Sequence, residues 1–270
     1  MSVAPREEMI DVGGIRAHTL IGGSGPALLV LHGAGGPNGW RRWHAALAER
    51  FTVYAPAHPG FGLSDDPSWM ESVRDVARYY LWFIDVVGIR GAHLIGASMG
   101  GWIAAELACM DPHAIDHLVL VGPAGLKPEA GEIYDIFYYP LDKVREAGFH
   151  DPAQVPEWDE LYSSPPTREQ QDLGIRNREM AARLVWKPYL FNPRLPHFLP
   201  RIDNPTLVIW GDDDRIIPPI CGQQYARHLP NARLEIIERC GHSPQLERPD
   251  SFLGVTLPFL TDQAGPGGSR

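Results

Sequence analysis

The sequence predicts an α/β protein with a mostly parallel sheet flanked by helices. Apolar runs of strand length alternate with helical patterns along most of the chain, which is the order of elements that a parallel sheet requires. With 270 residues, 44% of them hydrophobic and 21% charged, the chain is long enough to bury a substantial core. Since α/β folds of this length are commonly one domain, we expect a single domain that carries an insertion.

The first elements predict a hairpin, and the later ones alternate. Met9–Val12 and Ile15–Leu20 flank Gly13–Gly14, a turn signal that places an antiparallel pair at the start of the sheet. Further on, apolar residues recur at helical spacing after Ser72, which begins a capping box. Gly88 suits the end of that helix.

Residues 92–110 run from an apolar strand through a sharp turn into an apolar helix, and the turn reads Gly-x-Ser-x-Gly around Ser98. Such a reversal strains the central residue and leaves no room for side chains two positions away, which explains Gly96 and Gly100. The Ser98 hydroxyl would stand clear of the sheet, and the Met99 N–H would point toward the same space, where an oxyanion is stabilised. The pattern predicts a nucleophilic serine.

A serine nucleophile needs a histidine as base and a carboxylate to orient it. Two later strands supply them. The apolar run at 205–210 ends in Gly211 and the aspartates of positions 212–214, and the run at 234–238 is followed by Gly241–His242. The order along the chain is serine, then acid, then histidine, which is the order of one known class of hydrolases.

In these motifs the chain resembles the α/β-hydrolase superfamily, in its serine-hydrolase, esterase-like branch with a helical cap. The resemblance extends from about Glu8 to Leu260. The acid of this family usually lies four residues before a proline, and this selects Asp214, four residues before Pro218, over its two neighbours. The implied triad is Ser98, Asp214 and His242.

The segment Leu28–Gly36 is similar to the strand and oxyanion loop of the same family. The resemblance implies that the Ala34 N–H is the second oxyanion donor beside that of Met99. It also implies that His32 and Gly33 support the loop, with His32 bracing it rather than transferring protons.

Residues 122–205 form a connection much longer than a simple crossover between parallel strands. We expect a hydrolase core at 1–125 and 204–262, a helical cap at 126–203 and a disordered tail at 263–270. We assign about two-thirds of the cap's many aromatic residues to its own small core and expect the remainder to face Ser98. The candidate substrate contacts are Trp102, Tyr138 and Trp186, although core packing also accounts for Trp102.

Composition excludes several classes of partner. A net charge of −9 without a polybasic face argues against nucleic acid. The first residues lack the apolar run of a signal peptide, and no segment approaches the roughly 18 apolar residues of a membrane span, so we expect a cytoplasmic protein that does not bind membranes. Cys109, Cys221 and Cys240 are too few and too scattered for a disulfide framework and are expected to be buried.

Neither a metal nor a cofactor is expected. The eleven histidines show no metal-ligand spacing. The glycines of residues 33–36 fall short of a dinucleotide motif, because Asn38 stands where the third glycine belongs and no acid ends the following strand. His44 and His58 have no assignable role.

These observations predict a hydrolase that cleaves a small apolar carboxylic ester through an acyl-enzyme on Ser98, with water activated by His242 releasing the acid. Its partner is a small-molecule substrate. Two alternatives stay open. One is a carbon–carbon bond hydrolase acting on a vinylogous diketone acid from aromatic ring cleavage, which has a similar triad and cap. The other is a small-molecule receptor on the same fold, which an intact triad disfavours.

Overall fold

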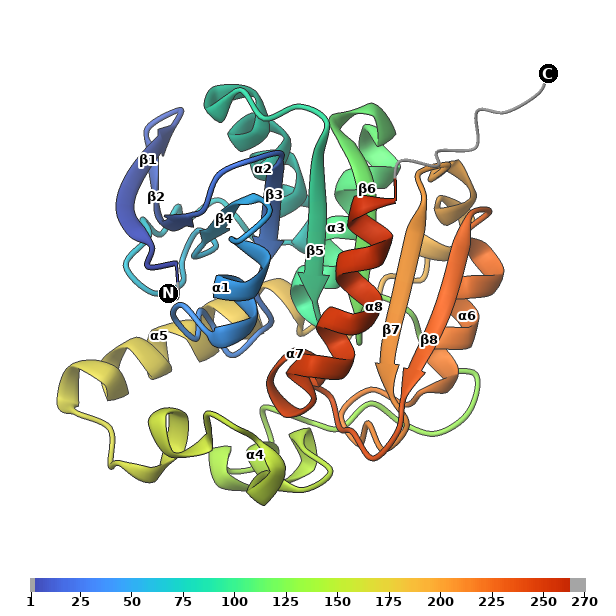
Figure 1. The fold of residues 1–270 in the computed structure, drawn as a ribbon. Helices are drawn as coiled ribbons and strands as arrows, with labels where there is room; N and C mark the ends of the chain where they lie inside the picture. Colours follow the sequence, from blue (N-terminus) through green and yellow to red (C-terminus); the bar gives the residue numbers. More distant parts are fainter. Residues whose placement is uncertain (1–2, 263–270) are drawn as a thin grey trace.

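The computed structural model describes residues 3–262 and contains an eight-stranded sheet in the order β1-β2-β4-β3-β5-β6-β7-β8 (Figure 1). The strands are β1 (Arg6–Val12), β2 (Ile15–Gly22), β3 (Ala27–Leu31), β4 (Thr52–Pro56), β5 (Ala92–Ala97), β6 (Ile115–Val121), β7 (Thr206–Gly211) and β8 (Ala232–Ile237). β1 and β2 form the predicted antiparallel hairpin, and β2 also runs antiparallel to β4. All other neighbours are parallel, which confirms the predicted fold class.

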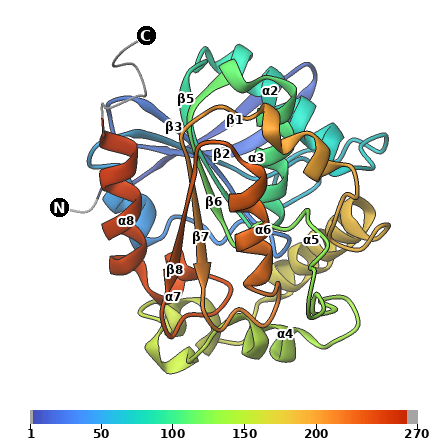
Figure 2. The same cartoon turned by 90° about the vertical axis from the view of Figure 1, so that its right-hand side faces the viewer.

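Helices cover both faces of the sheet (Figure 2). One face packs against α1 (Arg42–Leu47), α7 (Pro244–Glu247) and α8 (Pro249–Thr261). The other face packs against α2 (Val73–Val87), α3 (Met99–Met110) and α6 (Ile220–His228). Because helices cover both faces of the sheet, an inner strand such as β7 is buried at every residue.

Local sequence signals set the ends of α2. The Ser72 hydroxyl accepts the N–H of Asp75 at 3.2 Å and caps the first turn. Gly88 ends the helix with a φ of 74°, a left-handed conformation that a side chain disfavours. The predicted start and end of this helix are confirmed. α3 is buried at every residue but its last, as its uniformly apolar sequence predicts.

The long connection between β6 and β7 contains α4 (Leu141–Gly148) and α5 (Arg168–Val185). It lies beyond the carboxyl ends of the parallel strands, below the sheet in Figure 1. Four short helical turns also lie in this connection, at Pro152–Gln154, Asp159–Ser163, Leu195–His197 and Leu199–Arg201, and a further turn, Pro112–Ala114, precedes β6. We call residues 126–203 the cap. Its division from a core at 1–125 and 204–262 stays a prediction, and the predicted tail at 263–270 lies outside the described residues.

Aromatic rings pack against one another within the cap. Phe149, Trp158 and Tyr162 form one group, with the Trp158 and Tyr162 ring centroids 4.6 Å apart. Phe137 contacts both Trp186 and Tyr189 in a second group. Such ring contacts stabilise a long connection that prolines divide into short pieces.

Two compositional predictions have a structural outcome. All three cysteines are free and buried, as expected. Within residues 3–262, no helix combines the length and the apolar character needed to cross a membrane.

Candidate active site

Ser98 lies where β5 turns into α3, with a φ of 54° and a ψ of −117°. This is a strained conformation for a residue with a side chain. A Cβ at Gly96 would approach the carbonyl oxygen of Gly100 to 2.4 Å, and a Cβ at Gly100 would approach that of Leu31 to 2.3 Å. Both glycines are therefore needed for the helix to meet the sheet so closely, in agreement with the steric argument from the sequence.

Three side chains from three loops form one hydrogen-bonded row. His242 Nε2 lies 2.9 Å from Ser98 Oγ, and His242 Nδ1 lies 2.7 Å from Asp214 Oδ2. The fully buried Asp214 carboxylate also accepts the N–H groups of Ile216 and Ile217 on Oδ1, each at 2.9 Å. These bonds fix the carboxylate, so His242 keeps its proton on Nδ1 and offers the Nε2 lone pair to the serine.

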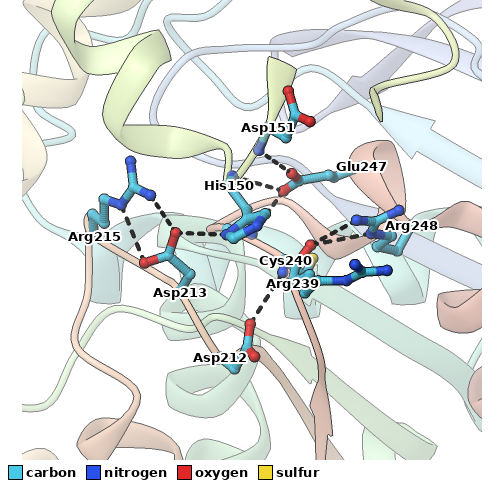
Figure 3. Close-up of polar contacts among 10 residues, drawn as sticks. His150, Asp151, Asp212, Asp213, Arg215, Arg239, Cys240, Glu247 and Arg248 are labelled. Carbon is cyan, nitrogen blue, oxygen red and sulfur yellow. Dashed lines mark hydrogen bonds and ion pairs between the residues drawn. The ribbon is translucent and has the colours of Figure 1, made fainter. Parts of the chain in front are cut away.

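The neighbouring aspartates hold other partners. Asp212 accepts the N–H of Cys240 at 3.1 Å. Asp213 pairs with Arg215 and with His150, whose Nδ1 lies 2.8 Å from its carboxylate (Figure 3). The structure thus brings Asp214 alone of the three to His242.

The loop after β3 is braced by two histidines. The backbone N–H of His58 donates to His32 Nε2 at 3.0 Å, so the ring proton of His32 sits on Nδ1, which donates to the carbonyl of Gly33 at 2.7 Å. His58 in turn donates from Nε2 to the His32 carbonyl at 2.8 Å and accepts the hydroxyl of Tyr80 at 2.6 Å. His58, for which the sequence indicated no role, belongs to the support of this loop.

The predicted oxyanion residues flank the serine. Ala34 lines the same cavity as Ser98, and Met99 is the first residue of α3. A Cβ added to Gly33 would lie 3.2 Å from the Ser98 Cβ, so a larger residue there would crowd the serine.

A cavity of about 350 Å³ opens on Ser98 and His242 between the core and the cap. Apolar side chains form much of its cap wall: Ile136, Phe137, Leu141, Val144, Phe149 and Tyr162. Its volume lies in the range of sites for small molecules.

The three predicted substrate contacts lie outside this cavity. Trp102 is buried in the core and donates its indole N–H to Glu106 at 3.2 Å. The alternative prediction for this residue, that it packs in the core, is confirmed. The side chains of Tyr138 and Trp186 are turned outward, with exposures of 78% and 58%. Phe137, which precedes Tyr138 in sequence and contacts the ring of Trp186, lines the cavity instead.

Two arginines at the cavity have no acidic side chain within 4.0 Å among residues 3–262. The guanidinium of Arg178 donates to the carbonyl of Phe137 at 2.6 Å, which holds it in place. That of Arg145 lies 4.7 Å from the ring centre of Tyr162. A guanidinium in such a position can pair with a carboxylate.

Glu247 joins the His242 loop to the cap. Its buried carboxylate accepts the N–H groups of Gly241 at 2.7 Å, Asp151 at 2.8 Å and His150 at 3.2 Å (Figure 3). The N–H of His242 itself donates to the carbonyl of Gly148 at 2.9 Å. The loop that carries the histidine is therefore held by both the core and the cap.

Comparisons with known proteins agree with this geometry. Residues 26–249 match the family model described as alpha/beta hydrolase fold. The chain is 34% identical to a 2-hydroxy-6-oxononadienedioate/2-hydroxy-6-oxononatrienedioate hydrolase of Burkholderia vietnamiensis, over 91% of each chain. It is 30% identical to a 2-hydroxy-6-oxo-6-phenylhexa-2,4-dienoate hydrolase of Burkholderia cepacia, over 92% of each.

Two solved structures are also similar. One is the 2-hydroxy-6-oxo-6-phenylhexa-2,4-dienoate hydrolase of a Rhodococcus species, with a TM-score of 0.79 and 27% identity over 96% of this chain and 99% of that one. The other is a bacterial membrane phospholipase A, with a TM-score of 0.75 and 30% identity over 95% of this chain and 86% of that one.

Replacing Glu247 with glutamine should lower kcat about tenfold while KM changes little. In glutamine one of the two carboxylate oxygens becomes an NH₂ group, which cannot accept a backbone N–H. Leaving that N–H without an acceptor costs about 1–3 kcal/mol, and His242 is held less firmly. Steady-state kinetics across pH measure this effect. Glu238→Gln, at an exposed position, is the matched control. An unchanged kcat and pH profile for Glu247→Gln would show that the contact is only structural.

Acid should destabilise the fold in the window from about pH 6.5 down to pH 4. Lost hydration lowers the pKa of His32 to about 4, that of His44 to about 3 and that of His58 well below its usual value, so all three stay neutral when folded. The unfolded chain takes up these protons near pH 6.5, so stability is complete above that pH and falls below it, by about 4 kcal/mol per pH unit for three histidines.

Urea midpoints measured between pH 8 and pH 4.5 test this expectation. His44→Gln should reduce the change in folding stability per pH unit by about one third. His113→Gln, at an exposed position, should leave this pH dependence unchanged. A constant midpoint from pH 7 to pH 5 would contradict the assignment of neutral buried histidines.

Proposed function

Because the chain belongs to the α/β hydrolase fold family, we propose that it is a serine hydrolase that cleaves a carbon–carbon bond next to a ketone in a small, conjugated diketone acid. Ser98 acts as nucleophile, His242 as base and Asp214 as the group that orients the imidazole. The observation that carries the substrate class is a pair of arginines, Arg145 and Arg178, at a cavity that opens on Ser98. In the described part of the chain neither has an acidic side chain within 4.0 Å.

The relatives support the same class of substrate. The two Burkholderia proteins are named as hydrolases of 2-hydroxy-6-oxo acids, which contain both a ketone and a carboxylate. In this chain the carboxylate would pair with the guanidinium of Arg178, and the ketone would face Ser98. The apolar cap wall would contact the remaining carbon chain.

The reaction follows from the hydrogen-bonded row. Ser98 Oγ attacks the ketone carbon while His242 Nε2 takes its proton, and the N–H groups of Ala34 and Met99 hold the oxyanion. The bond to the adjacent carbon then breaks, its electron pair passes into the conjugated acid fragment, and that fragment takes the proton from His242. Water deprotonated by His242 releases the acyl group from Ser98, so one water is consumed and two acids form.

Ester hydrolysis, the reaction that the sequence motifs predict, is the second candidate. The same residues would form the same kind of acyl-enzyme, and the 30% identity to a phospholipase A favours retaining it. The two Burkholderia relatives, which match more than nine-tenths of the chain, support the carbon–carbon reaction better. A receptor without turnover has no support beyond the shared fold.

Turnover of two substrate classes separates these candidates. We expect kcat/KM for 2-hydroxy-6-oxo-6-phenylhexa-2,4-dienoate to exceed that for p-nitrophenyl esters by about a hundredfold. Ser98→Ala should lower kcat for either substrate by about 10⁴- to 10⁶-fold, and the exposed Ser251→Ala should not. Faster ester turnover would favour the esterase, and tight binding without turnover would favour the receptor.

Arg178→Gln should raise KM for the dienoate by about ten- to a hundredfold with a smaller change in kcat, because the charge holds a group remote from the reacting bond. KM for a neutral ester should change little. Arg168→Gln, an exposed arginine on the same helix, is the control. Equal effects on the acid and the ester would argue against a carboxylate partner.

A further inference from the structure

At the amino ends of β5 and β6, away from Ser98, the two strands leave regular pairing. Ala92 pairs with Ile115 and Leu94 with Leu118, so one residue of β5, His93, stands opposite two residues of β6, Asp116 and His117. Neighbours in a regular strand point to opposite faces of the sheet, and a bulge re-aims side chains. Here it brings both β6 side chains toward His93.

The three side chains form a compact set of donor atoms. His117 Nδ1 lies 3.1 Å and His93 Nδ1 lies 3.7 Å from Asp116 Oδ2. One candidate ligand atom from each of the three residues lies within 4.8 Å of the other two. A tetrahedral zinc ion with bonds of about 2.0–2.1 Å holds its ligand atoms about 3.4 Å apart. The two distances from the Asp116 carboxylate oxygen, 3.1 Å and 3.7 Å, lie close to that value.

The two histidines have unused nitrogen atoms. Nδ1 of His93 and Nδ1 of His117 are buried and make no hydrogen bond within residues 3–262, and the residues are 8% and 9% exposed. A buried polar atom without a hydrogen bond is costly, and a ligand that accepts both lone pairs would remove that cost.

Surrounding aromatic rings fix the imidazoles. The Phe51 ring meets that of His93 edge-on with centroids 5.5 Å apart, and Phe259 of α8 meets His117 in the same way at 5.1 Å. The side chain of Asp116 is 56% exposed, so the set is open to ions and water on one side. Two fixed nitrogens and one adjustable carboxylate are a donor set typical of a preorganised site.

We propose that His93, Asp116 and His117 bind a divalent transition-metal ion of the zinc class, with water completing the coordination. Two imidazole nitrogens and one carboxylate oxygen suit this class of ion, whereas Mg²⁺ and Ca²⁺ prefer oxygen alone. The sequence offered no such site, because its ligands come from two strands and meet only through the bulge. Bound metal would join β6 to β5, the strand that ends one residue before Ser98, and would stabilise the fold without entering the reaction.

Zinc binding to the metal-stripped protein tests the site. We expect calorimetry to detect Zn²⁺ binding that requires Asp116, and the thermal midpoint to rise by about 5 °C at a hundredfold excess over Kd. Co²⁺ should give visible absorption typical of four-coordinate N/O ligation, and Mg²⁺ should change nothing. Turnover should be the same with Zn²⁺ or with chelator.

Variants identify the ligands. Asp116→Asn, at an exposed position, should keep the fold and weaken Zn²⁺ at least about tenfold, whereas the exposed His113→Gln should bind as the parent does. His93→Gln should abolish the Co²⁺ spectrum, and if it does not fold, Asp116→Asn still decides. Absence of Zn²⁺ binding by the parent, or equal binding by Asp116→Asn, would overturn the proposal.

Discussion

The close approach of α3 to the sheet at Gly100 decides where the other groups of the site lie. A single β-carbon there would collide with the carbonyls of Leu31 and His32, so glycine allows the helix to start against the end of β3. That contact turns Ser98 out of the sheet at a φ of 54° and sets it beside the loop braced by His32. Nucleophile and oxyanion loop are therefore placed by one packing constraint rather than by separate ones.

The acid and the base depend on polar contacts instead. Asp214 is held by two backbone N–H groups, and the His242 loop is held by Glu247 and by the carbonyl of Gly148. A fully buried carboxylate with several amide donors is rigid, because leaving any of those groups unpaired costs free energy. The imidazole of His242 thus lies between a carboxylate fixed by hydrogen bonds and a serine fixed by sterics. In this position it can take the proton of the serine hydroxyl.

Features set by neighbouring residues were predictable from sequence, and features that join distant segments were not. The hairpin, both ends of α2 and the turn at Ser98 follow from local sterics and capping. The contribution of His58 and Glu247 depends on partners far along the chain, so no spacing revealed it. Tyr138 and Trp186 failed as cavity residues because Tyr138 lies in a turn and Trp186 at the end of α5, where no periodicity tells an inward from an outward face.

The contacts of Glu247 limit how this scaffold can be recombined. Ser98 precedes the cap in sequence, and Asp214 and His242 follow it. Since no triad residue lies in the cap, replacing it with the cap of another hydrolase would appear to leave the triad intact. Residues 148–151, however, supply one carbonyl to His242 and two N–H groups to Glu247. A chimera that grafts a foreign cap while discarding this short stretch would lose part of the native base geometry, so the natural graft boundary falls after Asp151 rather than at the end of β6.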